Sequence, residues 1–340
     1  MATLSYANPT LLDLAKQSDY QGNVVSDIIE ILNDTNPILQ DLPVMECNSG
    51  TKHLTTIRSG IPQATWRRLY QGVQPQKGTN TQVEDTCGML EAWSEVDAKL
   101  VALSANPRQF RLNEAIAFIE GMNQQMAEAI FYGNTDADPE QFMGLTPRFD
   151  SLSADNGGQI INAGGTGNAN TSIWMVVWGP RTAHGLYPKG SKAGLGREDK
   201  GKTTKEVSDG SLYDVFREKF TWDIGLSVRD WRYVVRIANI DVTAMNAGTT
   251  DMFGLLRDAF WACKQRQITG GRTAIYCNTD VCKALDKQAT PTSATVSSSV
   301  TPGALRYTPS EIDGKEIMSH RGVPIRETDA IINTEANCGS

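Results

Sequence analysis

The most regular pattern of apolar and polar positions in the chain lies between residues 106 and 132. Apolar side chains recur there every three or four residues, as on the buried face of a helix; they are Leu112, Ala115, Ile116, Ile119, Met122, Met126, Ala129 and Ile130. Asn106 and Pro107 are typical of the start of a helix, and Gly133 is typical of its end. The pattern predicts a helix roughly 40 Å long at about 1.5 Å per residue.

A second pattern, within residues 53–97, predicts two strands joined by a long excursion. Residues 55–57 and 81–96 are rich in strand-forming side chains. The stretch between them is rich in residues that favour turns, namely Gly60, Pro62, Gly72, Pro75 and Gly78. A two-stranded ribbon by itself is marginally stable in water, so we expect this one to lie on a neighbouring molecule.

The rest of the chain carries shorter patterns, which together predict an α+β fold. In an N-terminal arm that ends near residue 52, apolar residues around positions 24–32 predict one helical piece. Beyond Pro147, strands are predicted at residues 173–178, 213–223, 232–237 and 273–277, and helices at residues 251–267 and 279–288. Loops are predicted at residues 157–170, 189–209 and 290–302. Short closing strands are predicted around Ile317, Val323, Ile325, Ile331 and Ile332.

Composition narrows the functional classes. The formal net charge is −7, which argues against a nucleic-acid-binding module but not against a protein that encloses DNA. The N-terminus lacks the basic and apolar regions of a secretory signal, and the most compact apolar stretch, residues 173–178, is too short to span a bilayer. The six cysteines form no CxxC pair. We expect them to be buried or free thiols in a protein made in a reducing cytoplasm, with no membrane partner.

One segment matches a catalytic pattern. Residues 196–203 satisfy GxxxxGK[ST], in which Lys202 would reach phosphate oxygens and Thr203 would bind magnesium. A true P-loop follows a buried strand and opens a helix, whereas this segment lies between polar, glycine-containing sequences. Glu198 and Asp199 would also place two carboxylates in a cradle for anions. A charged surface loop is the favoured interpretation, and a nucleotide-binding enzyme is the alternative.

Other candidate chemistry is weaker. The glycine-rich residues 164–167 precede a predicted strand instead of following one, unlike a dinucleotide-binding turn. His53, His184 and His320 are far apart in the chain and lack the spacing of a metal site. No GxSxG motif occurs. We therefore predict no catalytic, cofactor-binding or metal-ligating residues, and a protein that is not an enzyme.

The middle of the excursion carries the residues that we predict to contact another subunit. Tryptophan, arginine and tyrosine are enriched in interface hot spots, and here they are consecutive: Trp66, Arg67, Arg68, Leu69 and Tyr70. At the tip of a ribbon, burial of these side chains in the hydrophobic core of their own subunit is least expected. The alternatives are a hairpin folded back on its own domain and nucleic-acid binding through the two arginines.

The order of these elements resembles the HK97-like coat proteins of tailed bacteriophages. The sequence is also similar to the major capsid proteins of short-tailed phages. The similar stretches are collinear: residues 1–13 (MATLSYANPTLLD), 65–75 (TWRRLYQGVQP), 82–97 (QVEDTCGMLEAWSEVD), 120–134 (EGMNQQMAEAIFYGN), 220–233 (FTWDIGLSVRDWRY) and 321–335 (RGVPIRETDAIINTE). Each stretch is modest in specificity, and together they span nearly the whole chain.

The resemblance implies a domain layout. It consists of an N-terminal arm (residues 1–52), an E-loop hairpin with adjoining P-domain strands (53–97), and a P-domain spine helix with the following loop (98–149). A mixed α/β A domain (mainly 150–308) and closing strands of the P domain (309–340) complete it.

The resemblance also implies a function. Hexamers and pentamers would tile an icosahedral shell around phage DNA, assembled in the host cytoplasm. A separate scaffolding protein is expected because the arm is short, together with a portal and, in some phages, a decoration protein. Another self-assembling phage structural protein is the alternative within this class.

The P-loop interpretation is directly testable. Because the flanking sequence lacks the strand and helix of a P-loop, we expect the purified protein to hydrolyse no ATP in the presence of magnesium. Lys202→Ala should leave particle formation intact. A magnesium-dependent turnover that the substitution abolishes would contradict this prediction.

Overall fold

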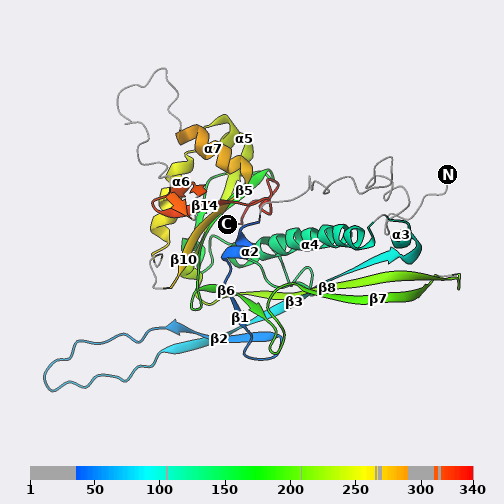
Figure 1. The fold of residues 1–340 in the computed structure, drawn as a ribbon. Helices are drawn as coiled ribbons and strands as arrows, with labels where there is room; N and C mark the ends of the chain where they lie inside the picture. The colour runs from blue at the N-terminus through cyan, green and yellow to red at the C-terminus, as the bar shows by residue number, and fades with distance from the viewer. Residues whose placement is uncertain are drawn as a thin grey trace. The chain divides into compact units, whose positions relative to one another are not determined.

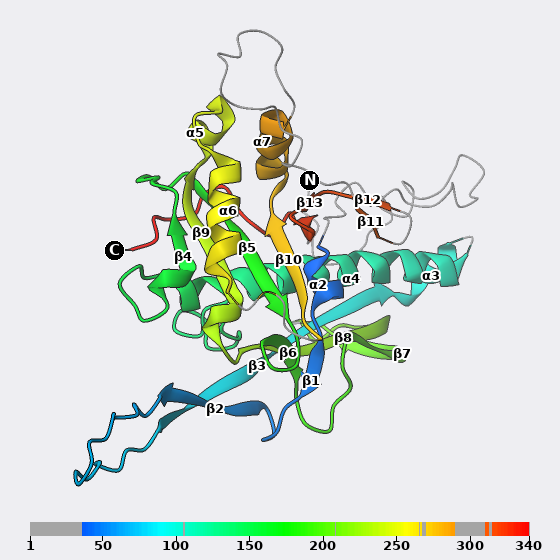
Figure 2. The same ribbon diagram turned by 90° about the vertical axis from the view of Figure 1, so that its left-hand side faces the viewer.

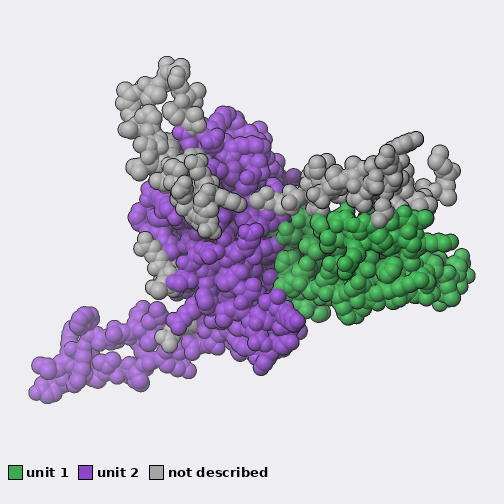
Figure 3. Space-filling model, viewed as in Figure 1, with its two compact units in different colours: residues 1–35, 89–127, 194–223 green, residues 36–88, 128–193, 224–340 purple. Residues whose placement is uncertain are grey.

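The computed structural model describes residues 36–104, 106–207, 209–264, 266, 270–289, 310–312 and 315–339. The chain divides into two compact units (Figure 3). Unit 1 contains Met89–Ala127 and Gly194–Asp223, and unit 2 contains Asn36–Gly88, Glu128–Ala193 and the chain from Ile224 onward. The helix predicted around residues 24–32 and the loop predicted at residues 290–302 lie outside the described residues.

The central strand of unit 2 is β5 (Asn170–Trp178), which is buried along its whole length. It pairs antiparallel with β9 (Val234–Asp241) on one side and with β10 (Arg272–Cys277) on the other. Beyond them, β4 (Ile160–Asn162) lies parallel to β9 and β14 (Val323–Glu327) lies parallel to β10. The edge strand β13 (Ser319–His320) pairs antiparallel with β14.

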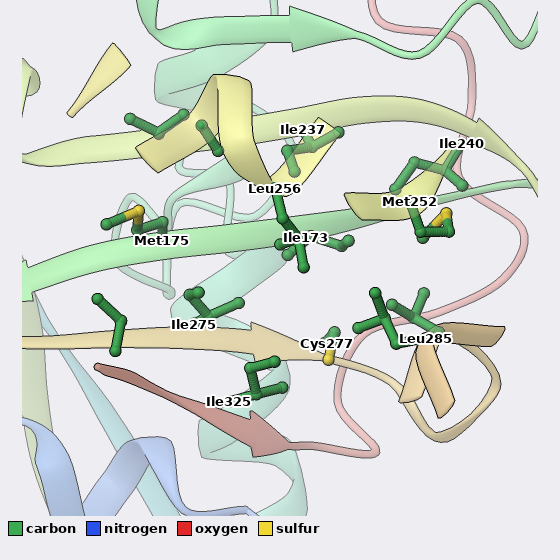
Figure 4. Close-up of a cluster of buried hydrophobic side chains, with 14 of the residues drawn as sticks. Ile173, Met175, Ile237, Ile240, Met252, Leu256, Ile275, Cys277, Leu285 and Ile325 are labelled. Atoms are coloured by element: carbon green, nitrogen blue, oxygen red, sulfur yellow. The ribbon is translucent and has the colours of Figure 1, made fainter. Parts of the chain in front are cut away.

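Side-chain alternation gives this sheet two buried faces. On one face Ile173, Met175 and Ile275 belong to a cluster with Leu256 and Leu285 from the covering helices (Figure 4). Those helices are α5 (Val242–Ala247), α6 (Met252–Ala262) and α7 (Thr279–Ala289), and α6 lies along the sheet (Figure 2). Because both faces are covered, the continuous apolar run of β5 is a consequence of double burial.

The opposite face is held by aromatic rings and one buried ion pair. The Trp174 ring lies 6.4 Å from the Phe131 ring and 6.0 Å from the Phe149 ring. Arg236 is 2% exposed, and its guanidinium donates to Glu335 Oε2 at 2.9 Å and to the Phe149 carbonyl at 2.8 Å. Glu335 also accepts from Tyr132 Oη at 2.6 Å. These bonds attach the C-terminal segment to the sheet.

The described part of the segment predicted as an N-terminal arm is attached to the same sheet. Asp41, in the short helix α2 (Ile38–Asp41), is buried and accepts a hydrogen bond from Tyr276 Oη at 2.9 Å. Arg326 of β14 pairs with the same carboxylate at 3.3 Å. Next, β1 (Val44–Glu46) pairs parallel with β6 (Ala183–Tyr187), and β6 pairs antiparallel with residues 225–228 of β8 (Leu212–Val228).

Unit 1 is built on a helix and a sheet. It contains residues 107–127 of α4 (Pro107–Tyr132), residues 89–97 of β3 (Thr79–Asp97), α3 (Ala98–Leu103) and β7 (Gly196–Glu206) (Figure 1). β7 pairs antiparallel with residues 212–221 of β8. Ala115, Met122 and Phe220 form a core with the partly buried Phe118 and Ile119. Part of the apolar stripe predicted for this helix therefore faces a sheet, whereas Leu112 and Ile116 of that stripe are exposed.

Several short elements connect the longer ones. Within the described ranges, 3₁₀ turns occur at η1 (Thr146–Phe149), η2 (Gly157–Gln159) and η3 (Trp231–Tyr233). β11 (Ser310–Ile312) and β12 (Lys315–Ile317) pair antiparallel, and β2 (Lys52–Gly60) pairs antiparallel with the first part of β3. Within the described residues, no helix is long and apolar enough to cross a membrane.

Most predicted elements are confirmed, including the helix that begins at Pro107 and ends at Tyr132. The loop predicted at residues 189–209 is wrong, because β7 occupies much of it. β7 is largely exposed and polar, and ion pairs such as Arg111–Asp199 (2.8 Å) and Arg197–Glu218 (2.6 Å) accompany it. A strand held by ion pairs and ladder hydrogen bonds leaves no alternation of apolar residues to detect. The GxxxxGK[ST] pattern thus lies within an antiparallel strand.

Smaller differences have local causes. The loop predicted at 157–170 contains β4, and the strand predicted from Arg232 begins at Val234 because η3 precedes it. The helix predicted to residue 267 ends at Ala262, where the Cys263 amide caps the Ala259 carbonyl. Ile331 and Ile332 are not in a strand, since the last strand before them ends at Glu327.

The buried ion pair predicts a large effect on stability. Glu335→Ala leaves the Arg236 guanidinium buried without its carboxylate, so the free energy of unfolding should fall by about 3–5 kcal/mol. Lys283→Ala removes an exposed pair with Asp280 and should change it by less than about 1 kcal/mol. Urea denaturation of the unassembled subunit measures both. Equal, small effects of the two substitutions would show that the buried pair is not a major stabilising contact.

Candidate inter-subunit contact site

The candidate site is the tip of the hairpin formed by β2 and the first part of β3. The two strands pair antiparallel from Lys52 opposite Thr86 to Gly60 opposite Thr79. A Cβ atom on Gly60 would lie 2.4 Å from Thr79 Oγ1, so glycine permits the last close approach before the strands separate. Residues 61–78 then form the blue loop that extends away from β5 and β10 in Figure 1.

The tip has a defined local structure. The Gln71 amide donates to the Arg68 carbonyl at 3.2 Å, which closes a turn around Leu69 and Tyr70. Arg67 Nε donates to the Gln71 carbonyl at 2.9 Å. Tyr70 has φ 63°, the left-handed conformation that a non-glycine residue seldom adopts. The side chains of the turn therefore have a defined arrangement in space.

These side chains are almost fully exposed. Trp66 is 99% exposed, Leu69 is 88% exposed and Tyr70 is 102% exposed. Large aromatic groups contribute much of the binding energy of protein interfaces when they are covered. Among the described residues the apolar tip packs against no core, which argues against a hairpin folded back on its own domain.

Charge is segregated along the hairpin. Residues 53–83 contain Arg58, Arg67, Arg68 and Lys77 and no aspartate or glutamate, although the whole chain carries a net charge of −7. A basic, aromatic tip on an acidic chain favours an acidic partner surface. The five predicted contact residues thus share one turn, and their contact with a neighbouring subunit stays a prediction.

The base of the hairpin contains residues that the sequence did not connect. His53 of β2 and His184 of β6 have ring centroids 5.8 Å apart. An Arg229 guanidinium nitrogen lies 3.0 Å from His53 Nε2. Cys47 and Cys87 have sulfur atoms 3.4 Å apart. Spacing gave no signal for these pairs, since the two histidines are far apart in the chain and pairing across strands brings them together.

Both histidines are poor proton acceptors. Burial lowers the pKa of His184 to about 4, and the charge of Arg229 and the neighbouring His53 contribute. Burial and Arg229 also lower the pKa of His53. Neutral rings therefore pack at the hairpin base near neutral pH. In the part of the chain that the structure describes, no group of three or more His, Cys, Asp or Glu residues could hold a metal ion.

A basic aromatic tip that its own chain leaves uncovered, on an α+β body without a metal cluster among its described residues, is typical of a subunit that assembles with other subunits. Comparison with known proteins defines the class. The family described as major capsid protein GP7 matches residues 19–338, and the chain belongs to this family.

One of the similar solved structures supports this family. A structure of bacteriophage Epsilon15 is 38% identical, covers 99% of this chain and 99% of that chain, and has a TM-score of 0.75. The holo-SrpI encapsulin complex of Synechococcus elongatus PCC 7942 gives 12% identity, 69% and 98% coverage, and a TM-score of 0.47. The capsid of an empty GTA particle is 10% identical, covers 64% of this chain and 94% of that chain, and has a TM-score of 0.42. No curated protein sequence matches the chain.

The chain is thus a major capsid protein of a phage virion, with an HK97-like α+β fold, and it self-assembles into a shell. The resemblance noted in the sequence is confirmed at the level of family and fold.

The buried histidines predict a pH-dependent loss of stability. Histidine in the unfolded chain has a pKa of about 6.5, whereas His184 in the folded subunit has a pKa of about 4. Between these two pH values the unfolded chain binds a proton that the folded subunit does not, so the free energy of unfolding decreases as the pH falls from about 6.5 towards 4. We expect the free energy of unfolding to fall by about 2 kcal/mol between pH 7.5 and pH 5 from this group. In His184→Phe, denaturant titrations should show a shallower pH dependence. An unchanged slope would contradict this assignment.

Proposed function

We propose that this subunit forms hexamers and pentamers that tile an icosahedral shell around phage DNA, and that the hairpin tip joins neighbouring subunits. Trp66, Arg67, Arg68, Leu69 and Tyr70 are the proposed contact residues. One observation supports this role above all: an ordered turn of aromatic and basic side chains is nearly fully exposed. In an isolated protein that arrangement exposes apolar surface without benefit, whereas in a shell it is covered at every repeat.

The domain layout follows from the resemblance. We propose that residues 53–97 form the E-loop with adjoining P-domain strands, and residues 98–149 the spine helix and following loop. Residues 150–308 form mainly the A domain, and residues 309–340 the closing strands. Residues 1–52 act as an N-terminal arm.

We propose that the protein is not an enzyme and takes no cofactor. The observation that supports this is the position of residues 196–203 in an antiparallel strand paired with β8, because an extended backbone directs successive amides to opposite sides and does not converge them on a phosphate. Assembly is proposed to occur in the host cytoplasm, with a separate scaffolding protein, a portal and, where present, a decoration protein. The acidic balance of the chain fits a wall that encloses DNA without binding its sequence.

Substitution at the tip tests the proposed contact. Trp66→Ala or Arg68→Glu should leave the subunit folded and impair shell formation, because truncation of a hot-spot side chain costs about 2 kcal/mol or more of binding at each contact. Sedimentation and electron microscopy report the shells, and circular dichroism with thermal melting reports the fold.

Gln74→Ala is the matched control, since it alters an exposed polar residue of the same loop. It should assemble like the wild type. Tip variants that assemble normally would place the contact elsewhere, and variants that unfold as monomers would make the tip part of its own domain.

A further inference from the structure

Unit 2 contains a cavity of about 540 Å³ beside the base of the hairpin. It is lined by residues 83–86 of β3 and by Thr135, Pro139, Met143, Pro147 and Arg148. Its volume is within the range of pockets that bind small molecules, roughly 300–1,000 Å³, and is ample for one aromatic side chain. The proline and methionine side chains provide apolar walls of the kind that aromatic rings contact.

The cavity is preformed by close backbone packing. A Cβ atom on Gly88 would lie 3.2 Å from the Glu140 carbonyl oxygen, so glycine lets the loop of residues 133–145 lie against β3. The ends of that loop are joined by a hydrogen bond of 2.7 Å from the Gly144 amide to the Gly133 carbonyl. Behind it, Arg148 pairs with the buried Asp85 at 2.7 Å. Contacts within one subunit therefore hold the walls of the cavity together.

The loop that forms one wall is acidic. Residues 133–147 contain Asp136, Asp138 and Glu140 and no lysine or arginine, and all three acidic residues are exposed. Glu84 adds a fourth carboxylate, which pairs with the exposed Lys52. The one basic side chain lining the cavity, Arg148, is neutralised by Asp85. The charge of this surface is opposite to that of the hairpin tip.

We infer that this cavity receives the hairpin tip of a second copy of the chain, with Trp66 inside and Arg67 and Arg68 against the acidic loop. The inference rests on the proposed function and adds the receiving surface. The tip of the same chain is not the occupant, because Trp66 is 99% exposed. A second copy supplies the complementary feature: an aromatic side chain beside two arginines, in a segment without acidic residues.

Charge reversal on both surfaces tests the pairing. Arg67→Glu with Arg68→Glu places acid against acid, and Asp136→Lys with Asp138→Lys places base against base. Each double variant should raise the concentration needed for assembly by at least about tenfold, since like charges across an interface are unfavourable. The quadruple variant restores opposite charges and should assemble like the wild type.

The matched control combines the tip reversal with Asp258→Lys and Asp286→Lys, two exposed acids of unit 2 away from the cavity lining. This combination should not restore assembly. Rescue by the control as well as by the quadruple variant would mean that only net charge matters, and would overturn the inference.

Cross-linking separates this inference from the proposed function. Trp66 is replaced by p-benzoylphenylalanine, and particles assembled from mixed nitrogen-14 and nitrogen-15 subunits are irradiated and digested with trypsin. Attachment to residues 135–147 of the tryptic peptide 112–148, in isotopically mixed pairs, is the expected result. Attachment to a different segment of another copy overturns the receiving surface but leaves the tip as a contact. Attachment within one copy, or no attachment in intact particles, overturns the inference, and unimpaired assembly of Trp66→Ala in addition overturns the proposed function.

Discussion

The buried contact between Arg236 and Glu335 is the interaction on which unit 2 depends. Arg236 lies on β9 in the middle of the sheet, whereas Glu335 lies near the end of the chain. Ser172 of β5 also bonds to this carboxylate, and so does Tyr132 at the end of α4. Charges removed from water are costly unless each is bonded by several partners, and this arrangement meets that condition. Burial and the adjacent carboxylate raise the pKa of Tyr132, so its hydroxyl remains a donor to Glu335.

The two units differ in how their strands are stabilised. In unit 2 the central strands are apolar and covered on both faces, and the sequence predicted β5, β9 and β10 for that reason. In unit 1 the outer strand β7 is polar, and Glu95 pairs with Lys205 and with Arg217, the latter at 2.7 Å. Hydrophobic patterning detects burial in a core, so it predicted α4 closely and missed β7. Short elements such as α5 were missed because six residues are too few to show the periodic spacing of apolar side chains that indicates a helix.

The candidate site was predictable to the extent that it is local. Five consecutive residues form the tip, and their side-chain types alone indicated a contact. The receiving cavity combines residues near position 84 with residues near position 143, and no spacing in the chain relates them. The same holds for His53 and His184, which strand pairing brings together. The sequence therefore identifies a binding site when the site is one continuous segment. When a site is formed by segments far apart in the chain, the fold is needed to identify it.

The hairpin combines a closed turn with separated legs. The structure assigns no strand pairing to residues 61–68 or 71–78, which flank the turn, although all of them are described. Backbone without a ladder bends at a lower energetic cost than paired strands, whereas the turn is closed by its own hydrogen bonds. If the tip is the contact proposed above, the same side chains can stay in contact while the angle between two neighbouring subunits differs from place to place in the shell. One amino-acid sequence can then serve at both flat and curved positions of a closed surface.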